Sequence, residues 1–217
     1  MNTMPESLHL IAASEDAAWA GWLEPVPHDF YHTAAYHRFS ARWDAAEAHL
    51  AVYGDRRRYL AWPHLLRPLA GGLRDVTSVY GYAGPLLYGC EPGDSFLERA
   101  TARIFELWRS QDVVTVFTRF HPILENHLGL SAEDVVAGGQ TVAIDLAFAE
   151  EAQWSDYQGG LRNHINRGRR LGLRTEADSA WDRLPDFARF YRAAMERNRA
   201  ERRYYFPIEY FEDLRRA

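Results

Sequence analysis

The sequence predicts a mixed α/β fold in which helices flank a largely antiparallel sheet, and three observations support it. Residues 48–54 and 58–69 are two β-prone runs around a Gly-Asp turn, a pattern typical of a β-hairpin. Residues 94–109 repeat an apolar side chain at every fourth position, which indicates an amphipathic helix. Residues 112–120 are rich in β-branched side chains, so we expect a central, buried strand there.

The remaining elements of the first part follow from local patterns. Ser14 and Thr33 are suitable N-caps for helices over 15–23 and 34–46. The other segments are expected to form a brief strand at 29–33, a strand entering a glycine-rich loop at 73–89, and two strands at 133–146 that meet at Gly138–Gly139.

The character of the chain changes after residue 147. Residues 148–217 offer helices, including 182–199 and one from Pro207 onward, but hardly any strand, so they contain no sheet on which to pack. We therefore expect a first domain at 1–147 and the start of a second, incomplete α/β domain at 148–217. The alternative is that these helices cover the first domain.

Composition limits the class of protein. The 217 residues are 47% hydrophobic with a formal net charge of −5, which fits a globular protein and argues against DNA binding over the whole surface. The single cysteine, Cys90, excludes an internal disulfide and a cysteine-built zinc site. We see no secretory signal and no membrane span, so a cytoplasmic location is expected.

Several stretches in this order resemble one family. They are "YHTAAYHRF", "TSVYGYAGPL", "FTRFHPILEN", "YQGGLRNHINRGRRLGL" and the late "FPIEYFEDL". Together they resemble the FemAB-like branch of the GNAT acyltransferases, whose full-length members pair two GNAT-like domains. The resemblance implies a GNAT-like first domain and the N-terminal part of a second one.

The resemblance also implies an activity. Such enzymes transfer an acyl or aminoacyl group to an amine, so acyl-CoA or aminoacyl-tRNA is the expected co-substrate and no cofactor is bound permanently. The expected partners are a small-molecule or peptide-precursor amine and, with the second type of donor, tRNA. Whether this chain is active by itself stays open.

Two features depart from the family pattern. The pyrophosphate loop typical of GNAT enzymes, Arg or Gln followed by x-x-Gly-x-Gly/Ala, is absent, and "NRGRRLG" has a different spacing. Cell-wall members carry a basic residue just before the "PIEYF"-like motif, where this chain has Tyr204, Tyr205 and Phe206. The second departure argues against a nucleotide-linked cell-wall acceptor.

The matching motifs give the candidate substrate-binding residues: Tyr36, Arg38, Tyr80, Tyr82, Arg119, Arg162, Asn163, Arg167, Arg170 and Tyr205.

The arginine-rich run at 161–174 suits phosphate, because the planar guanidinium group binds oxygens through two donors. The alternative is a solvated helix face whose basic residues favour the helix C-terminus. This run also supports a competing function, a non-catalytic module that binds RNA or a phosphorylated ligand. A scaffold without activity is the third possibility.

Two further motifs carry candidate chemistry. Tyr80 and Tyr82 flank Gly81 and share a face if the segment is extended, so they either orient a polar substrate or pack in the core. Arg119 and His121 lie on one face at the end of the predicted strand. His121 is the candidate general base; alternatively it is hydrogen-bonded within the fold.

Other kinds of catalysis find little support in the sequence. The histidines form no metal-binding pattern such as HExxH, so no metal is expected. No G-x-S-x-G motif is present, which disfavours a covalent acyl-enzyme. Direct attack of an amine on a bound thioester or ester is the expected reaction.

Overall fold

A computed structural model describes residues 5–131 and 134–217 and divides the chain into two units. One unit holds the chain up to Gly138 together with Glu212–Ala217, and the other holds Gly139–Phe211. Each unit is described by itself.

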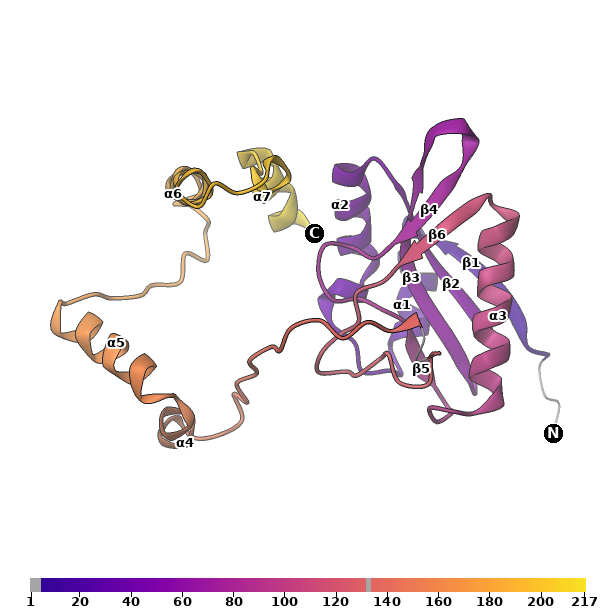
Figure 1. Ribbon diagram of the computed structural model, residues 1–217, viewed down its shortest axis with the longest axis horizontal. Helices are drawn as coiled ribbons and strands as arrows, with labels where there is room; N and C mark the ends of the chain where they lie inside the picture. The colour runs from indigo at the N-terminus through magenta and orange to yellow at the C-terminus, as the bar shows by residue number, and fades with distance from the viewer. Residues whose placement is uncertain (1–4, 132–133) are drawn as a thin grey trace. The chain divides into compact units, whose positions relative to one another are not determined.

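The first unit is a mixed α/β structure with a largely antiparallel sheet, as predicted. Its strands follow the order β1-β2-β3-β4-β6, and β5 pairs with β3 off this path (Figure 1). The strands are β1 (Ser7–Ala12), β2 (Glu47–Gly54), β3 (Tyr59–Pro68), β4 (Arg74–Thr77), β5 (Leu86–Tyr88) and β6 (Val113–Phe117). The helices are α1 (Asp16–Leu23), α2 (Ala34–Asp44) and α3 (Ser95–Ser110), with short 3₁₀ turns η1 (Phe30–His32) and η2 (Ala70–Gly72).

The β2–β3 hairpin forms the centre of the sheet and divides its side chains between two cores. Leu50 and Val52 face the cluster that contains Trp19 and Trp22 of α1, whereas Ala51, between them, faces the cluster that contains α3. Successive side chains of a strand point to opposite faces of the sheet. Each strand of the hairpin therefore contributes apolar side chains to both faces, and helices cover both faces. In Figure 1, α3 lies on one face, and α1 and α2 lie on the other.

The helix α3 confirms the prediction made from its four-residue repeat. Asp94 caps its N-terminus by accepting from the amide of Phe96 at 2.8 Å. The side chains of Phe96, Ala100 and Ile104 are fully buried against the sheet. Thr33 likewise caps α2 as predicted, by accepting from the amide of Tyr36.

Four local predictions are wrong. The N-cap residue of α1 is Glu15 and not Ser14, and no described side chain caps this helix. Residues 29–33 form η1 instead of a strand, because the Asp29 carboxylate accepts from the amide of Tyr31 and starts a helical turn. The strand β6 lies at the sheet edge, so Val114 and Phe117 are more than half exposed and not buried. Residues 134–146 form no strand, and residue 133, where that predicted pair begins, lies outside the described residues.

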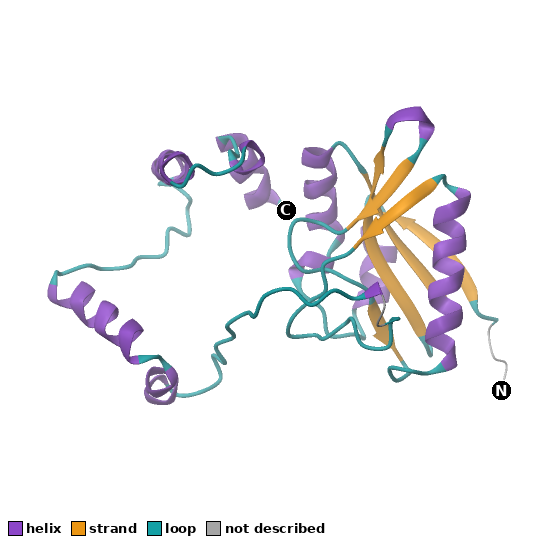
Figure 2. Cartoon of the chain, in the orientation of Figure 1, coloured by secondary structure: helices purple, strands orange, loops and turns teal. Residues whose placement is uncertain are grey.

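In the second unit the described residues form helices joined by loops (Figure 2). The helices are α4 (Glu150–Asp156), α5 (Gly159–Arg170) and α6 (Leu184–Arg197), the turn η4 (Arg202–Tyr204), and α7 (Ile208–Arg216), whose last residues belong to the first unit. Phe187, Tyr191 and Phe211 pack their rings together, with centroids 5.1–6.1 Å apart. This aromatic packing joins α6 to the start of α7.

Candidate functional site

Four aromatic rings of the first unit lie together, and Tyr80 joins them through its backbone carbonyl. We call these residues the tyrosine cluster: Phe30, Tyr31, Tyr36, Tyr80 and Tyr82. The ring centroids of Tyr31 lie 5.4 Å from Tyr36 and 6.2 Å from Tyr82. Tyr36 is buried, whereas Phe30, Tyr80 and Tyr82 keep 41–54% of their surface exposed. The cluster therefore exposes the rings of Phe30, Tyr80 and Tyr82 to solvent, while Tyr36 is buried.

The cluster forms where two parallel strands end. The strands β4 and β6 run in the same direction, so the loops that follow them leave from the same edge of the sheet. The amide of Ser78 donates to the carbonyl of Phe117 at 3.0 Å, and the amide of Arg119 donates to the Ser78 hydroxyl at 3.1 Å. These bonds hold the two loops side by side.

The start of α2 completes the surface. The hydroxyl of Tyr36 donates to the backbone carbonyl of Tyr80 at 2.8 Å, which joins α2 to the loop after β4. The turn η1, just before α2, adds Phe30 and Tyr31. Three segments that are distant in sequence thus meet at one place.

Glycine is required at two positions of the loop after β4. Gly81 has a φ of 152°, and a Cβ atom there would lie 2.3 Å from the Tyr31 ring. Gly84 has a φ of 77°, and a Cβ atom there would lie 2.6 Å from the side-chain nitrogen of Asn126. The two glycines therefore allow Tyr31 and Asn126 to pack directly on the loop backbone.

Arg119 brings a positive charge to the cluster. Its guanidinium carbon lies 5.8 Å from the centroid of the Tyr80 ring, within the range of a cation–π contact. The side chain is exposed, and it takes part in none of the ion pairs formed by the described residues. An exposed arginine above aromatic rings can bind an anionic group while the rings stack on the remainder of a ligand.

His121, the predicted general base, is buried, and both of its ring nitrogens are engaged. Nδ1 accepts from the amides of Ile123 and Leu124, each at 3.2 Å. Because Nδ1 is an acceptor, the proton of the neutral ring lies on Nε2, which donates to the Asp29 carboxylate at 3.3 Å. This arrangement gives the neutral ring no lone pair for a substrate proton, and it favours the alternative that His121 holds the loop in place.

His32 lies beneath the cluster and is held in the same way. Its Nε2 donates to the carbonyl of Ala83 at 2.7 Å, and its Nδ1 accepts from the amide of Asp29 at 3.1 Å. Burial lowers the pKa of His32 to about 4, so the ring is neutral at pH 7. Burial, followed by the charge of Asp29, raises the pKa of Tyr31.

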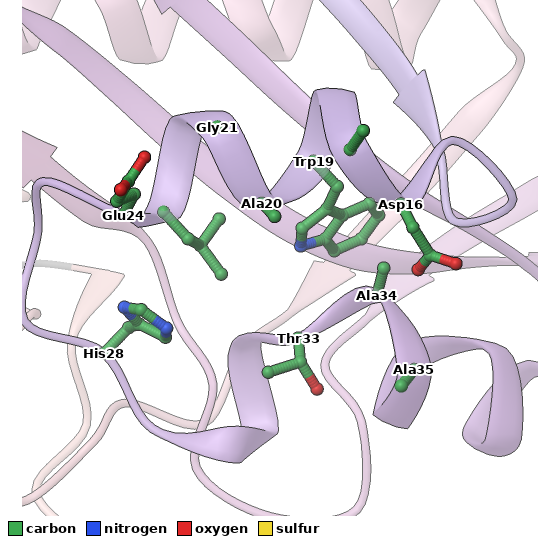
Figure 3. A pocket seen from close by; sticks show the side chains of 11 residues that line it. Asp16, Trp19, Ala20, Gly21, Glu24, His28, Thr33, Ala34 and Ala35 are labelled. Carbon is green, nitrogen blue, oxygen red and sulfur yellow. The ribbon is translucent and has the colours of Figure 1, made fainter.

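Arg38, another predicted site residue, points away from the tyrosine cluster. It donates to the Ala13 carbonyl and to the Asp16 carboxylate, and so ties α2 to the start of α1. Asp16 lies at the edge of a hollow of about 530 Å³ between α1 and the start of α2, lined by Trp19 and several alanines (Figure 3). We interpret Arg38 as a structural contact between the two helices.

The other predicted site residues belong to the second unit. Arg162, Asn163, Arg167 and Arg170 lie on α5, and Tyr205 follows η4. In this helix Arg162 is half-buried and the other three are exposed, and Leu161 is 47% exposed. The nearby Arg169 covers the Trp154 ring at 5.0 Å.

Sequence reasoning missed Asp29, Phe30, Tyr31 and Asn126. The first three lie in "DFYH", where an aspartate before aromatic residues is also a cap signal for a helical turn. Asn126 ends the stretch "FTRFHPILEN", but no local pattern gives its side chain a role. Its side chain accepts from the His121 amide and donates to the Ala83 carbonyl, each at 2.7 Å.

Comparison with models of known protein families, with curated proteins and with solved structures gives no match for this chain. Within the described residues, no group of three or more His, Cys, Asp or Glu side chains is arranged to hold a metal ion. None of the described helices combines the length and the hydropathy needed to cross a membrane. The fold and the site thus define a mixed α/β protein with an arginine-bearing aromatic surface at the ends of two parallel strands.

Proposed function

We propose that this chain is part of an N-acyltransferase of the FemAB-like GNAT type, and that its tyrosine cluster binds the amine acceptor. One observation carries the proposal. Tyr36, Tyr80, Tyr82 and Arg119, taken from three separate family-like motifs, gather on one surface. Residues that only packed the core would not leave Tyr80, Tyr82 and Arg119 exposed together.

The surface suits the binding half of an acyl transfer. Arg119 would pair with an anionic group of the acceptor, and the Tyr80 and Tyr82 rings would stack on its less polar part. The acceptor amine would then attack the carbonyl carbon of the donor. The new C–N bond replaces the C–S bond of acyl-CoA or the C–O bond of aminoacyl-tRNA, and the amine proton leaves with the thiol or the ribose hydroxyl.

Positioning is the main contribution expected from these residues. Holding two reactants in the correct geometry accelerates their reaction strongly, even without a reactive side chain. Asp29 and His121 fix the loops that carry the cluster. A cytoplasmic location fits the proposal, because both proposed donors are made there.

The test measures donor binding and acceptor transfer with the 217-residue chain. Acetyl-CoA and longer acyl-CoAs are titrated by calorimetry, aminoacyl-tRNA by filter binding, and transfer of a radiolabelled acyl group is followed with a panel of amino acids, amino sugars and short peptides. We expect binding of one donor class, and we expect Arg119→Ala to lower kcat/KM or acceptor affinity at least about tenfold, or about 1.4 kcal/mol.

Arg103→Ala is the matched control, because Arg103 is an exposed arginine of the same unit that pairs with Glu106 on α3. It should leave binding and transfer unchanged. Failure of both donor classes to bind would overturn the acyltransferase proposal. An equal loss in both variants would overturn the assignment of the acceptor to the tyrosine cluster.

A second candidate function is binding of RNA or a phosphorylated ligand by α5 and the residues after it. The observation in its favour is a set of arginines that form no ion pair within the described chain: Arg162, Arg167, Arg169, Arg170 and Arg174. Arginines that form no ion pair and lie close together along the chain can neutralise several phosphates.

Salt dependence and charge reversal test this candidate. If phosphates drive binding, the affinity for a single-stranded RNA should fall steeply as the salt concentration rises from about 50 mM to about 200 mM. Arg167→Glu with Arg170→Glu should abolish it. The control is Arg189→Glu with Arg192→Glu on α6, where both arginines already pair with neighbouring acids. RNA binding that resists both salt and the α5 double substitution would exclude the candidate.

A further inference from the structure

An apolar pocket of about 390 Å³ lies in the first unit, apart from the residues of the tyrosine cluster. Its volume falls within the range of about 300–1,000 Å³ that is usual for small-molecule sites. Most of its walls are leucine, proline, valine and isoleucine, and they come from several separate segments. The lining residues are Val26, Pro27, Leu60, Pro85, Leu86, Leu87, Cys90, Pro92, Leu97, Ile123, Leu124, Glu125, Asn126, Leu128 and Leu130.

The pocket lies where the two cores of the first unit approach each other. Val26 and Leu86 belong to the core beside α1, whereas Leu60 and Leu97 belong to the core beside α3. These walls are built from fully packed residues, so the pocket has a firm apolar floor.

The loop of residues 121–130 forms a second wall of the pocket, and some of its apolar side chains are exposed to solvent. Ile123 is 71% exposed and Leu128 is 48% exposed. The loop is nevertheless anchored, because Asn126 bonds to His121 and Ala83 and because Gly129 lies against Leu97. An anchored loop that displays large apolar side chains beside a hollow offers them to an apolar ligand.

The polar groups of the pocket decide which ligands it excludes. Asn126 uses its side-chain oxygen and one amide hydrogen within the fold. Burial raises the pKa of the Cys90 thiol to about 11, so the thiol is neutral at pH 7. Glu125 is the charged residue among the lining residues, all of which the structure describes. The pocket thus holds no cation that could bind an anionic group.

We propose that this pocket binds an aliphatic chain whose head group is uncharged or cationic. The chain removes the walls and the rim residues Ile123 and Leu128 from water, and the head group lies near the Glu125 carboxylate. The inference concerns binding alone, so it stands or falls independently of the proposed acyl transfer.

The test uses a homologous series of 1-alkylamines, from hexylamine to decylamine, below their micelle concentrations, titrated into the 217-residue chain by calorimetry. Burial of each additional methylene should tighten binding about fourfold until the pocket is full. Octanoate should bind at least about tenfold more weakly than octylamine, because its carboxylate would lie near Glu125 and the lining residues include no cation.

Three variants locate the site. Ile123→Ser and Leu128→Ser, both at exposed positions, should weaken octylamine binding about fivefold or more by removing rim contacts. The control is Leu73→Ser, which removes a leucine beside β4 that is about as exposed as Leu128 and does not line the pocket. Equal weakening in all three variants would mean adsorption to the general surface and would overturn the proposal.

Cys90 gives a readout that needs no variant, since it is the single cysteine of the chain and lines the pocket. Saturating octylamine should slow alkylation of Cys90 by iodoacetamide at least about threefold, in proportion to occupancy of the site. An unchanged alkylation rate, or an affinity that does not vary with chain length, would overturn the proposal. Equal affinity for octylamine and octanoate would overturn the assignment of the head group.

Discussion

The indole N–H of Trp108 donates to Nε2 of His64 across 3.2 Å, and both side chains lie in the core between α3 and β3. The other ring nitrogen of His64 donates to the Trp62 carbonyl at 3.0 Å. The histidine is therefore a fully bonded, neutral member of the apolar core, and it fixes how α3 sits on the sheet.

Replacement of Trp108 by Phe should destabilise the fold by about 1–3 kcal/mol, because Nε2 of His64 loses its donor while it stays buried. Urea unfolding at pH 7 measures the loss. In a His64→Leu background the same Trp108→Phe change should cost only its packing contribution. An equal cost in both backgrounds would show that the hydrogen bond contributes nothing.

The free energy of unfolding should fall as the solution becomes acidic. Burial lowers the pKa of His32 and His64 to about 4 and that of His37 to about 3, from an ordinary value of 6.5. Folded-state pKa values below the unfolded value mean that the unfolded chain takes up protons first. Stability is thus complete above pH 6.5 and declines between pH 6.5 and 4, by up to about 1.4 kcal/mol per pH unit for each histidine.

Urea titrations at pH 7, 6 and 5 follow this decline. His37→Leu should make it shallower by the share of one histidine, whereas His164→Gln, at an exposed position on α5, should leave the slope unchanged. A stability that stays constant from pH 7 to pH 5 would contradict the prediction.

Gly81→Ala should destabilise the first unit by about 1–3 kcal/mol, through a positive φ and through contact of the new methyl group with the Tyr31 ring. Gly71→Ala separates the two effects, because Gly71 also has a positive φ but no atom lies near its missing Cβ. The difference between the two variants, measured by urea unfolding, should narrow when Tyr31 is replaced by Ala, and the strain of the larger φ at Gly81 should remain. If the difference is unchanged, the ring contact contributes nothing to it.

Asn126→Asp should cost about 1–3 kcal/mol of stability, because the amide donor to the Ala83 carbonyl is replaced by a carboxylate oxygen. The amide of His121 can still donate to the new side chain, so the loss is specific to Ala83. Asn163→Asp on the exposed α5 is the control and should change the free energy of unfolding by less than about 0.5 kcal/mol. Similar losses in both variants would refute the role assigned to Asn126.

The sequence predicts those elements whose pattern is set by burial. The four-residue repeat of α3 and the two β-prone runs of the hairpin give the correct elements, because both faces of the sheet are covered. The β-branched composition of β6 also predicts a buried strand, yet β6 lies at the edge of the sheet. Composition predicts that residues 113–117 form a strand. Whether another strand pairs with the outer edge of β6 depends on the topology of the sheet, which composition does not give.

The candidate site is predictable in part. Tyr80, Tyr82 and Arg119 stand in recognisable motifs, and the structure brings them together. Tyr31 and Asn126 also stand in quoted stretches, but no pattern gives them a role, since their contacts with Gly81 and Gly84 join segments that are many residues apart. The engaged ring nitrogens of His121 likewise depend on backbone amides whose directions no sequence pattern gives.

The parallel pairing of β4 with β6 has a consequence for the order of folding. The β2–β3 hairpin closes across the few residues of its turn, so its contacts cost little loop-closure entropy. β6 can join only after the chain has passed through β5 and α3 and returned to β4. Because distant contacts form slowly, we expect the hairpin to act as the template, and we expect β6 to dock after it and to exchange its amide hydrogens sooner than the hairpin.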